Sequence, residues 1–382
     1  MYTVNRAYSS MALTFSPALP QRIMDRSQPG PGKTLPAALE MLEDGNARLN
    51  IVAPTAQEVA IMSMTGKTVL DKDESGVWTT VIPAGNGGIR PLMLQIDGVS
   101  VINDQLPIGY GSSRATNFIE LPRNEGAGLL VRMENVPHGA VSQEIFWSET
   151  TQNWETCLVY TPAGYMSGAD SYPVLYIQHG LGENERCWTY QGKINLIMDN
   201  LLAAGKAKPC LIVMCNGMTP CTVNGAYNGH PELFEPFLIN DCIPHIEKTY
   251  RVKTDRENRA LAGLSMGSMQ TSMITMHHPE LFAYAGIFSG FLKKLQWIIR
   301  GPDDHLEMLN DEDAMRKTFK VFFRGIGKQD NFRTIFEEEN QLMADHHLSP
   351  EEWDAHTIHY YEGSHEWNVW RDCAADFLQM IF

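Results

Sequence analysis

One pentapeptide combines a nucleophile with the small neighbours that could expose it. Residues 263–267 read Gly-Leu-Ser-Met-Gly, a G-x-S-x-G pattern centred on Ser265. Such a serine projects its hydroxyl from a sharp strand-to-helix turn, which requires small flanking residues. The pattern alone could equally be a glycine-rich turn with a solvated serine. Its surroundings favour a nucleophile, because an apolar strand is predicted at 259–262 and a helix at 268–278.

A serine nucleophile needs a base that accepts its proton and an acid that orients the base. When the serine lies at such a turn of a parallel sheet, the acid and then the base follow it in the chain. Asp330 comes after the predicted strand 320–325, and His365 comes between the last predicted strand, 356–361, and the final helix. We therefore predict Ser265 as nucleophile, Asp330 as acid and His365 as base.

The other histidines and aspartates of this half of the chain fit these roles less well. They lie on predicted helices, inside the last strand or at its opposite end, or in a polar loop, where surface or structural roles are expected. They are His277, His278, His346, His347, His356, His359, Asp303, Asp304, Asp311, Asp313 and Asp354.

The oxyanion formed by attack on a carbonyl needs backbone N–H donors that are held in place beforehand. The residue after the nucleophile, Met266, should supply one donor. The loop after the predicted strand 172–178 should supply the other. This loop reads His-Gly-Leu-Gly at 179–182, and we predict the N–H of Leu181, because Gly180 would let the chain turn that group inward. A tight turn without a catalytic role is the alternative.

The elements that must position these residues change in character along the chain. Before about residue 120, short alternating runs separated by turns predict a small antiparallel β-sandwich. After residue 141, a hairpin leads into apolar strands that alternate with helical patterns, which predicts a largely parallel sheet. The predicted fold is thus an α/β-hydrolase with a doubly wound, mostly parallel sheet, preceded by a small antiparallel β-sandwich. We predict a leader at 1–40, the β-domain at 41–125 and the catalytic domain at 135–382.

Composition limits the classes of partner. The chain of 382 residues has 30 Lys and Arg against 45 Asp and Glu, a net charge of −15. Nucleic-acid binding is not expected, because it requires a basic face. No apolar run is long enough for a membrane helix, and no signal peptide is recognised, so we expect a cytoplasmic protein or a secreted one whose signal was removed. The sequence leaves the oligomeric state open.

The spacing of the cysteines does not predict a disulfide framework. The sequence also shows no spacing typical of metal ligands, so it predicts no metal site. Seven cysteines are scattered along the chain. Cys215 and Cys221 flank a loop and could pair in an oxidising compartment, with free thiols as the alternative. Nothing in the sequence calls for a metal or an organic cofactor.

Beyond these motifs, several blocks in order resemble the feruloyl-esterase-type carbohydrate esterases, relatives of esterase D. These blocks lie at 173–188, 234–252, 259–271, 325–331 and 363–378. In that family the serine, aspartate and histidine of the matching blocks form a catalytic triad, which here falls on Ser265, Asp330 and His365. Residues 53–59, 76–78 and 96–98 resemble the immunoglobulin-like, early-set modules that precede such esterases and are similar to glycogen-binding domains.

The resemblance implies a serine esterase that cleaves feruloyl or related hydroxycinnamoyl esters of plant xylan. An acetyl xylan esterase and an enterochelin-type siderophore esterase are the alternatives, and a carbohydrate-binding protein with an inactive hydrolase scaffold is the non-enzymatic one. Trp188 and Met218 could line an apolar slot for the acyl group or could be ordinary packing. Exposed aromatic residues of the front module could contact polysaccharide, although Trp78 is expected in its core. Two departures from the family are Ser268, in place of a glycine, and the two residues between Gly327 and Asp330.

Overall fold

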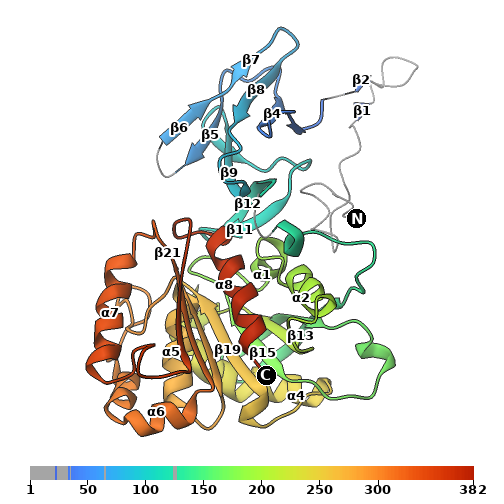
Figure 1. Cartoon of the computed structure of the whole chain (residues 1–382). Helices are drawn as coiled ribbons and strands as arrows, with labels where there is room; N and C mark the ends of the chain where they lie inside the picture. Colours follow the sequence, from blue (N-terminus) through green and yellow to red (C-terminus); the bar gives the residue numbers. More distant parts are fainter. Residues whose placement is uncertain (1–21, 24–32, 35, 64–65, 124–126) are drawn as a thin grey trace. The chain divides into compact units, whose positions relative to one another are not determined.

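The computed structural model describes residues 22–23, 33–34, 36–63, 66–123 and 127–382, which form two compact units divided between Glu134 and Asn135 (Figure 1). The predicted leader lies mostly outside the described residues. Its described part contains β1 (Arg22–Ile23), β2 (Lys33–Thr34) and the first residues of β3 (Leu39–Met41). The first sheet therefore begins slightly before residue 41, where we expected the β-domain to start.

In the described residues of the first unit, the strands all pair antiparallel. One sheet has the order β3-β4-β8-β7, and the other has the order β11-β12-β9-β5-β6 with β10 also paired to β9. Side chains of both sheets share one core, in which Trp78 is buried and donates its indole N–H to the carbonyl of Ala53, as expected for a core residue. The strands are β4 (Ala47–Val52), β5 (Val59–Ser63), β6 (Gly66–Val69), β7 (Asp71–Lys72), β8 (Val77–Ile82), β9 (Gly88–Ile96), β10 (Val99–Val101), β11 (Ile108–Gly111) and β12 (Arg114–Leu121).

An eight-stranded sheet organises the second unit. Its strands, in chain order, are β13 (Ala140–Ser148), β14 (Asn153–Thr161), β15 (Val174–Gln178), β16 (Leu211–Cys215), β19 (Arg259–Leu264), β20 (Tyr284–Phe288), β21 (Val321–Gly327) and β22 (His356–Tyr361). In space the order is β13-β14-β16-β15-β19-β20-β21-β22, with antiparallel pairing at β13–β14 and β14–β16 and parallel pairing elsewhere. The central strands are buried along their whole length, which explains their nearly continuous apolar sequences.

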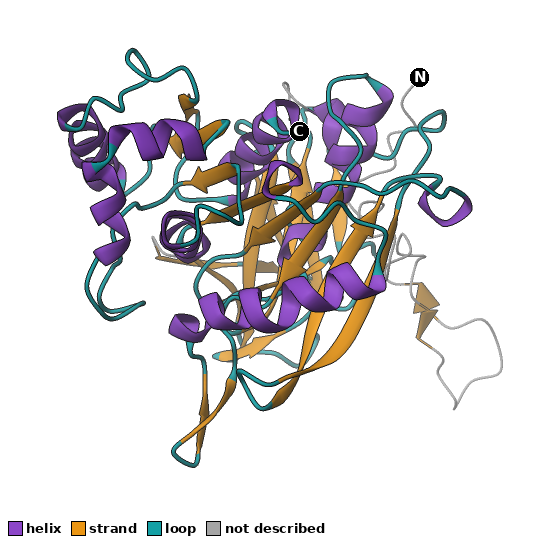
Figure 2. Cartoon of the chain, turned by 90° about the horizontal axis from the view of Figure 1, so that it is seen from below, coloured by secondary structure: helices purple, strands orange, loops and turns teal. Residues whose placement is uncertain are grey.

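Helices cover both faces of this sheet (Figure 2). Successive side chains of a strand point to opposite faces. In β20, Ala285 and Ile287 therefore share a core with α5, while Phe288 packs against Phe377 of α8. The helices are α1 (Cys187–Tyr190), α2 (Ile194–Ala203), α3 (Phe234–Phe237), α4 (Ile243–Thr249), α5 (Met266–His277), α6 (Glu312–Thr318), α7 (Arg333–Asp345) and α8 (Trp367–Met380). Short 3₁₀ turns include η7 (Asp304–Asn310), and η5 (Leu238–Cys242) is a π-turn.

Several segments of the second unit differ from the sequence-based expectation. The sequence of residues 233–250 has the pattern of one helix, but the structure divides it into α3, η5 and α4, with Pro244 in the first turn of α4. Proline has no N–H for an i→i−4 bond, which favours an interruption just before it. A small hairpin, β17 (Cys221–Val223) and β18 (Ala226–Asn228), and the short helix α6 were not predicted, because such brief elements carry little periodicity.

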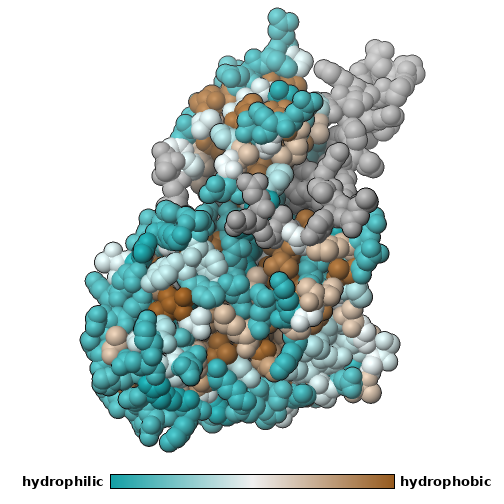
Figure 3. Space-filling view, in the orientation of Figure 1, coloured by the Kyte–Doolittle hydropathy of each residue, from teal (hydrophilic) through white to brown (hydrophobic). Residues whose placement is uncertain are grey.

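The visible surface of each unit is mostly hydrophilic, with small separate hydrophobic areas (Figure 3). This distribution agrees with the acidic composition of the chain. Among the described helices, none combines the length and the apolar character that crossing a membrane would require.

Candidate active site

Ser265 occupies a strained turn between β19 and α5. Its φ of 53° and ψ of −117° are unusual for a residue with a side chain. The two glycines of the pentapeptide make this turn sterically feasible. A Cβ on Gly263 would lie 2.3 Å from the carbonyl oxygen of Gly267, and a Cβ on Gly267 would lie 2.7 Å from that of His179. The turn therefore has the features of a nucleophile elbow.

The structure brings the three predicted side chains together at the carboxyl ends of their strands. His365 Nε2 lies 2.9 Å from Ser265 Oγ, and His365 Nδ1 lies 2.9 Å from Asp330 Oδ2. The Asp330 side chain is fully buried, whereas the His365 side chain keeps 21% exposure. This arrangement can remove the serine proton while the carboxylate holds the imidazole in one tautomer.

The loops that carry the acid and the base are bound to each other. Gln329 donates its backbone N–H to the Gly363 carbonyl and accepts the Gly363 N–H on its side chain, at 2.9 and 2.8 Å. The other oxygen of Asp330 accepts the N–H of Phe332 at 2.9 Å. Gln329, one of the two residues between Gly327 and Asp330, thus fixes the histidine loop to the aspartate loop.

Two backbone N–H groups lie beside the elbow as candidate oxyanion donors. Met266 is the first residue of α5, so its N–H has no intrahelical partner. Within the described part of the chain, no acceptor is recorded for the N–H of Leu181. We expected Gly180 to supply the turn, but the positive φ of 73° belongs to Gly182. Gly180 is instead needed for close approach, because a Cβ there would lie 2.9 Å from Leu264 Cδ1 and 3.4 Å from Ser265 Cβ.

Two further residues hold this loop, and the sequence reasoning did not single them out. Glu183 accepts the Gly180 N–H on one oxygen and the indole N–H of Trp367 on the other, at 2.9 and 2.8 Å. Burial raises the pKa of Glu183 to about 7. His179 and Glu183 directly flank the Gly-Leu-Gly segment in the sequence. This position beside the predicted oxyanion loop is the feature from which their role could have been predicted.

His179 acts from the other side of the same loop. Its ring is almost fully buried, and burial lowers its pKa to about 4. Its Nε2 accepts the N–H of Gly217 at 3.0 Å, which leaves the proton on Nδ1 to be donated to the Gly180 carbonyl at 2.8 Å. The neutral imidazole therefore joins the Gly180 loop to the loop after β16.

The two residues considered for the acyl group have different environments. Trp188 is 1% exposed, donates its indole N–H to the Gln178 carbonyl and packs edge-on against Trp367. Its ring therefore belongs to the core beneath the loop and offers no accessible surface. Met218 is only partly buried, and its neighbour Gly217 packs close to Met266, so it stays a candidate for contact with substrate.

Ser268, the departure from the family glycine, is accommodated by a second glycine. Its hydroxyl donates to the Ser265 carbonyl and accepts the N–H of Phe291. A Cβ on Gly290 would lie only 1.8 Å from this hydroxyl. Ser268 therefore stabilises the first turn of α5, and its space exists because position 290 has no side chain.

All seven cysteines are free thiols and are buried. Cys215 lies not beside Cys221 but 3.2 Å from Cys242, measured between the sulfur atoms. The sequence left open whether Cys215 and Cys221 pair or stay free, and in the structure they form no disulfide.

Comparison with known proteins shows the family of this chain. The Esterase family model matches residues 148–380, a span that includes all three candidate catalytic residues. This chain belongs to the Esterase family. An endo-1,4-beta-xylanase/feruloyl esterase of Xylanibacter ruminicola is 37% identical over 349 residues, covering 89% of this chain and 45% of that protein. The resemblance to feruloyl-esterase-type enzymes is thus confirmed, and the chain spans about half the length of the curated relatives it matches.

Solved structures support the fold of this Esterase-family chain. A ferulic acid esterase of the anaerobic fungus Anaeromyces mucronatus has a TM-score of 0.54 at 23% identity, covering 66% of this chain and 93% of that one. An enterobactin esterase of Shigella flexneri has a TM-score of 0.60 at 15% identity, covering 89% of this chain and 94% of that one. At these identities the likeness shows the α/β-hydrolase-type fold alone.

Proposed function

We propose that this protein is a serine carboxylic-ester hydrolase that works through an acyl-enzyme. The observation that supports it best is the pair of 2.9 Å contacts that joins Ser265 to His365 and His365 to Asp330. Membership of the Esterase family, over a span that includes these residues, supports the same reaction class.

In the proposed first step, Ser265 Oγ attacks the ester carbonyl carbon while His365 Nε2 takes the hydroxyl proton. The carbonyl oxygen becomes an oxyanion that accepts hydrogen bonds from the N–H groups of Leu181 and Met266, each contributing about a hundredfold to a thousandfold in rate. The C–O bond to the alcohol breaks, and His365 returns the proton to the departing alcohol oxygen. Water, deprotonated by His365, then releases the acid and restores Ser265.

For the substrate we propose feruloyl or related hydroxycinnamoyl esters of xylan-derived saccharides. A relative named as a xylanase and feruloyl esterase aligns with 89% of this chain, which supports this class. Met218, beside the elbow, could contact the acyl group. We propose that the first unit is an immunoglobulin-like early-set module, supported by its two antiparallel sheets, and that its exposed side chains contact polysaccharide.

A siderophore esterase of the enterochelin type is the second candidate. One observation favours it: the likeness to the enterobactin esterase covers 89% of this chain, so it extends into the first unit. The likeness to the ferulic acid esterase covers 66%. Fold alone does not determine substrate, so turnover has to discriminate between the two.

The test compares wild type with Ser265→Ala on methyl ferulate, p-nitrophenyl acetate, acetylated xylan and a catecholate trilactone. We expect methyl ferulate turnover in the wild type and a loss of at least about 10⁴-fold in kcat in the variant, because the nucleophile is gone. Activity that survives in Ser265→Ala would remove this serine as nucleophile. Acetyl turnover alone would indicate a deacetylase, and trilactone turnover alone a siderophore esterase.

The non-enzymatic alternative has its own test. A carbohydrate-binding protein on an inactive scaffold would not be labelled by a fluorophosphonate, which reacts with activated serines. We expect stoichiometric labelling of wild type and none of Ser265→Ala. Absence of labelling in both would favour the binding protein.

A further inference from the structure

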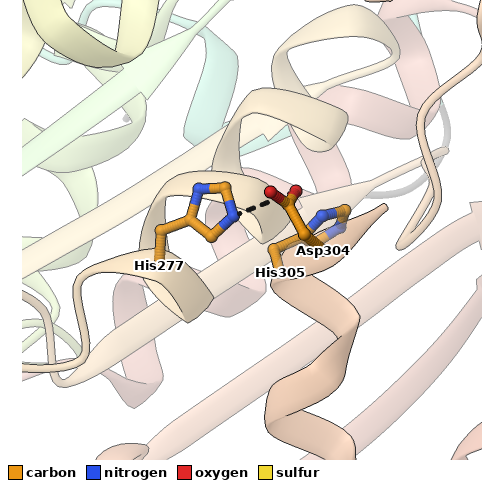
Figure 4. A group of neighbouring side chains, drawn as sticks. All are labelled: His277, Asp304 and His305. Atoms are coloured by element: carbon orange, nitrogen blue, oxygen red, sulfur yellow. Dashed lines mark ion pairs between the residues drawn. The ribbon is translucent and has the colours of Figure 1, made fainter. Parts of the chain in front are cut away.

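Three side chains with metal-binding atoms converge at the far end of the helix that begins at Ser265. His277 is the last residue of α5, and Asp304 and His305 begin η7. Each residue offers one ligand atom, and these atoms lie within 4.8 Å of one another. Figure 4 shows the Asp304 carboxylate directed at the His277 ring, with the ring of His305 beside it. At about 1.5 Å per residue, the 12-residue helix separates this group from Ser265 by roughly 18 Å.

The distances suit a small divalent ion with imidazole and carboxylate ligands. His277 Nε2 lies 3.4 Å from Asp304 Oδ1. Two ligands bound to zinc at about 2.0–2.1 Å and a tetrahedral angle would be roughly 3.3 Å apart. The carboxylate and the first imidazole are therefore already spaced as two zinc ligands would be, and the ligand atom of His305 lies within 4.8 Å of both.

Each histidine has its second nitrogen held by an acceptor outside the group. His277 Nδ1 contacts Glu235 Oε1 at 2.9 Å, and His305 Nε2 contacts the Leu292 carbonyl at 2.7 Å. Such contacts fix the tautomer, so that the other nitrogen presents its lone pair, as is usual for metal-bound histidines. The pairing thus leaves Nε2 of His277 and Nδ1 of His305 for an ion.

His305 gives an independent indication of a missing partner. The residue is 2% exposed, and its Nδ1 is buried without a hydrogen-bond partner within the described structure. A buried polar atom without a partner is destabilising, and natural proteins rarely leave one. A bound cation would satisfy it.

We propose that His277, Asp304 and His305 bind one divalent transition-metal ion, with zinc as the expected metal. Two imidazoles and one carboxylate form a common three-residue zinc set that leaves one position for water. The ion would join the C-terminal end of α5 to η7 and so stabilise the helix that carries Ser265 at its other end. The sequence predicted no metal site, because 26 residues separate His277 from Asp304 and no compact spacing is visible.

The neighbouring charges explain how the group persists without an ion. Lys294 Nζ lies 3.7 Å from Asp304 Oδ1, and Glu235 also accepts from His278 Nε2 at 2.9 Å. In the absence of metal, Lys294 partly neutralises the Asp304 carboxylate. In its presence, Glu235 would compensate part of the added positive charge.

The experiment measures zinc in tag-free full-length protein after chelator treatment, reloading with ZnCl₂ and gel filtration. Asp304→Asn and His277→Ala change partly exposed side chains and should fold. His278→Ala is the matched control, because it removes the adjacent histidine that also contacts Glu235 but offers no ligand. We expect about one zinc per chain in wild type and in His278→Ala, and at least a tenfold loss of affinity in the other two variants.

Two further readouts separate a specific site from loose surface binding. Zinc at about a hundredfold excess over its dissociation constant should raise the Tm of wild type by on the order of 5–10 °C, and should not raise that of Asp304→Asn. Substitution by Co²⁺ should give visible absorption bands of a four-coordinate ion in wild type only. The same zinc content and Tm response in wild type and in Asp304→Asn would overturn the proposal, as would no retained zinc in wild type. These readouts do not involve ester hydrolysis, so the outcome is independent of the proposed function.

Discussion

At the residue scale, the contacts of Asp330 predict which way an amide in its place would face. One Asp330 oxygen accepts the Phe332 N–H, and the other contacts His365 Nδ1. In Asp330→Asn, the amide oxygen would keep the Phe332 bond, so the NH₂ group would face His365. The imidazole would then carry its proton on Nε2 and could not accept the proton of Ser265. We expect kcat to fall by about 10⁴-fold.

The measurement is steady-state ester hydrolysis at saturating substrate together with a thermal unfolding curve. The unfolding midpoint of Asp330→Asn should stay close to that of wild type, because the substitution preserves shape. A kcat within tenfold of wild type would mean that Asp330 does not orient His365.

At the element scale, the junction of α5 with the loop after β20 depends on a complementary pair, Ser268 and Gly290. Gly290→Ala should destabilise the protein by about 1–3 kcal/mol, because its Cβ would lie 2.1 Å from Ser268 Cβ. Ser268→Gly should cost about 1–3 kcal/mol, because it leaves the buried Phe291 N–H without its acceptor. The double variant should be more stable than the sum predicts, since Ser268→Gly removes the atoms that the new Cβ meets.

Urea unfolding of the two single variants and the double variant checks this as a double-mutant cycle. We expect a coupling free energy of at least about 1 kcal/mol in favour of the double variant. Additive effects would show that the loop moves to accept alanine and that the two positions are independent.

At the scale of the whole molecule, buried histidines make stability depend on pH. Burial lowers the pKa of His356 to about 3 and that of His179 to about 4. In the unfolded chain these histidines have pKa values near 6.5. Between pH 6.5 and the lowered pKa values, the unfolded chain therefore binds more protons than the folded one. The contribution of the two neutral histidines to the free energy of unfolding is thus lost as the pH falls through this range. Glu183 acts in the opposite direction. Its raised pKa means that the folded protein holds this proton more tightly than the unfolded chain does, so the contribution of Glu183 to the free energy of unfolding is lost as the pH rises towards 7.

A comparison of wild type with His356→Gln isolates one of these opposing contributions. Glutamine can still donate to the Leu348 carbonyl, which His356 Nδ1 contacts at 2.7 Å, but it does not titrate. The unfolding free energy of wild type minus that of the variant should rise with pH from about 3 to about 6.5, by roughly 5 kcal/mol at most. Chemical unfolding at a series of pH values measures this difference. A difference independent of pH would show that His356 does not remain neutral in the folded protein.

The strands of the eight-stranded sheet were predicted within one or two residues, helped by the nearly continuous apolar sequences of its buried central strands. The start of α5 was placed too late, at Ser268 where the helix begins at Met266, because Gly267 has weak helix propensity. Tertiary contacts override that propensity, since Ser268 bonds to Ser265 and Phe291. The burial of Trp188 was equally invisible in the sequence, because α1 has only four residues and shows no periodicity that reveals which side chain faces the core.

The sequence by itself determined the order of elements and the chemical types at their ends: a serine in a glycine-flanked turn, and an acid and a histidine after later strands. It did so because local sterics and hydrophobic periodicity act between near neighbours in the chain. Only the tertiary structure decided the distances, since Ser265 and His365 are 100 residues apart and meet through the sheet. The same holds for His179 and Glu183 behind the oxyanion loop, and for His277, Asp304 and His305. Such groups depend on packing between distant segments, which no spacing along the chain encodes.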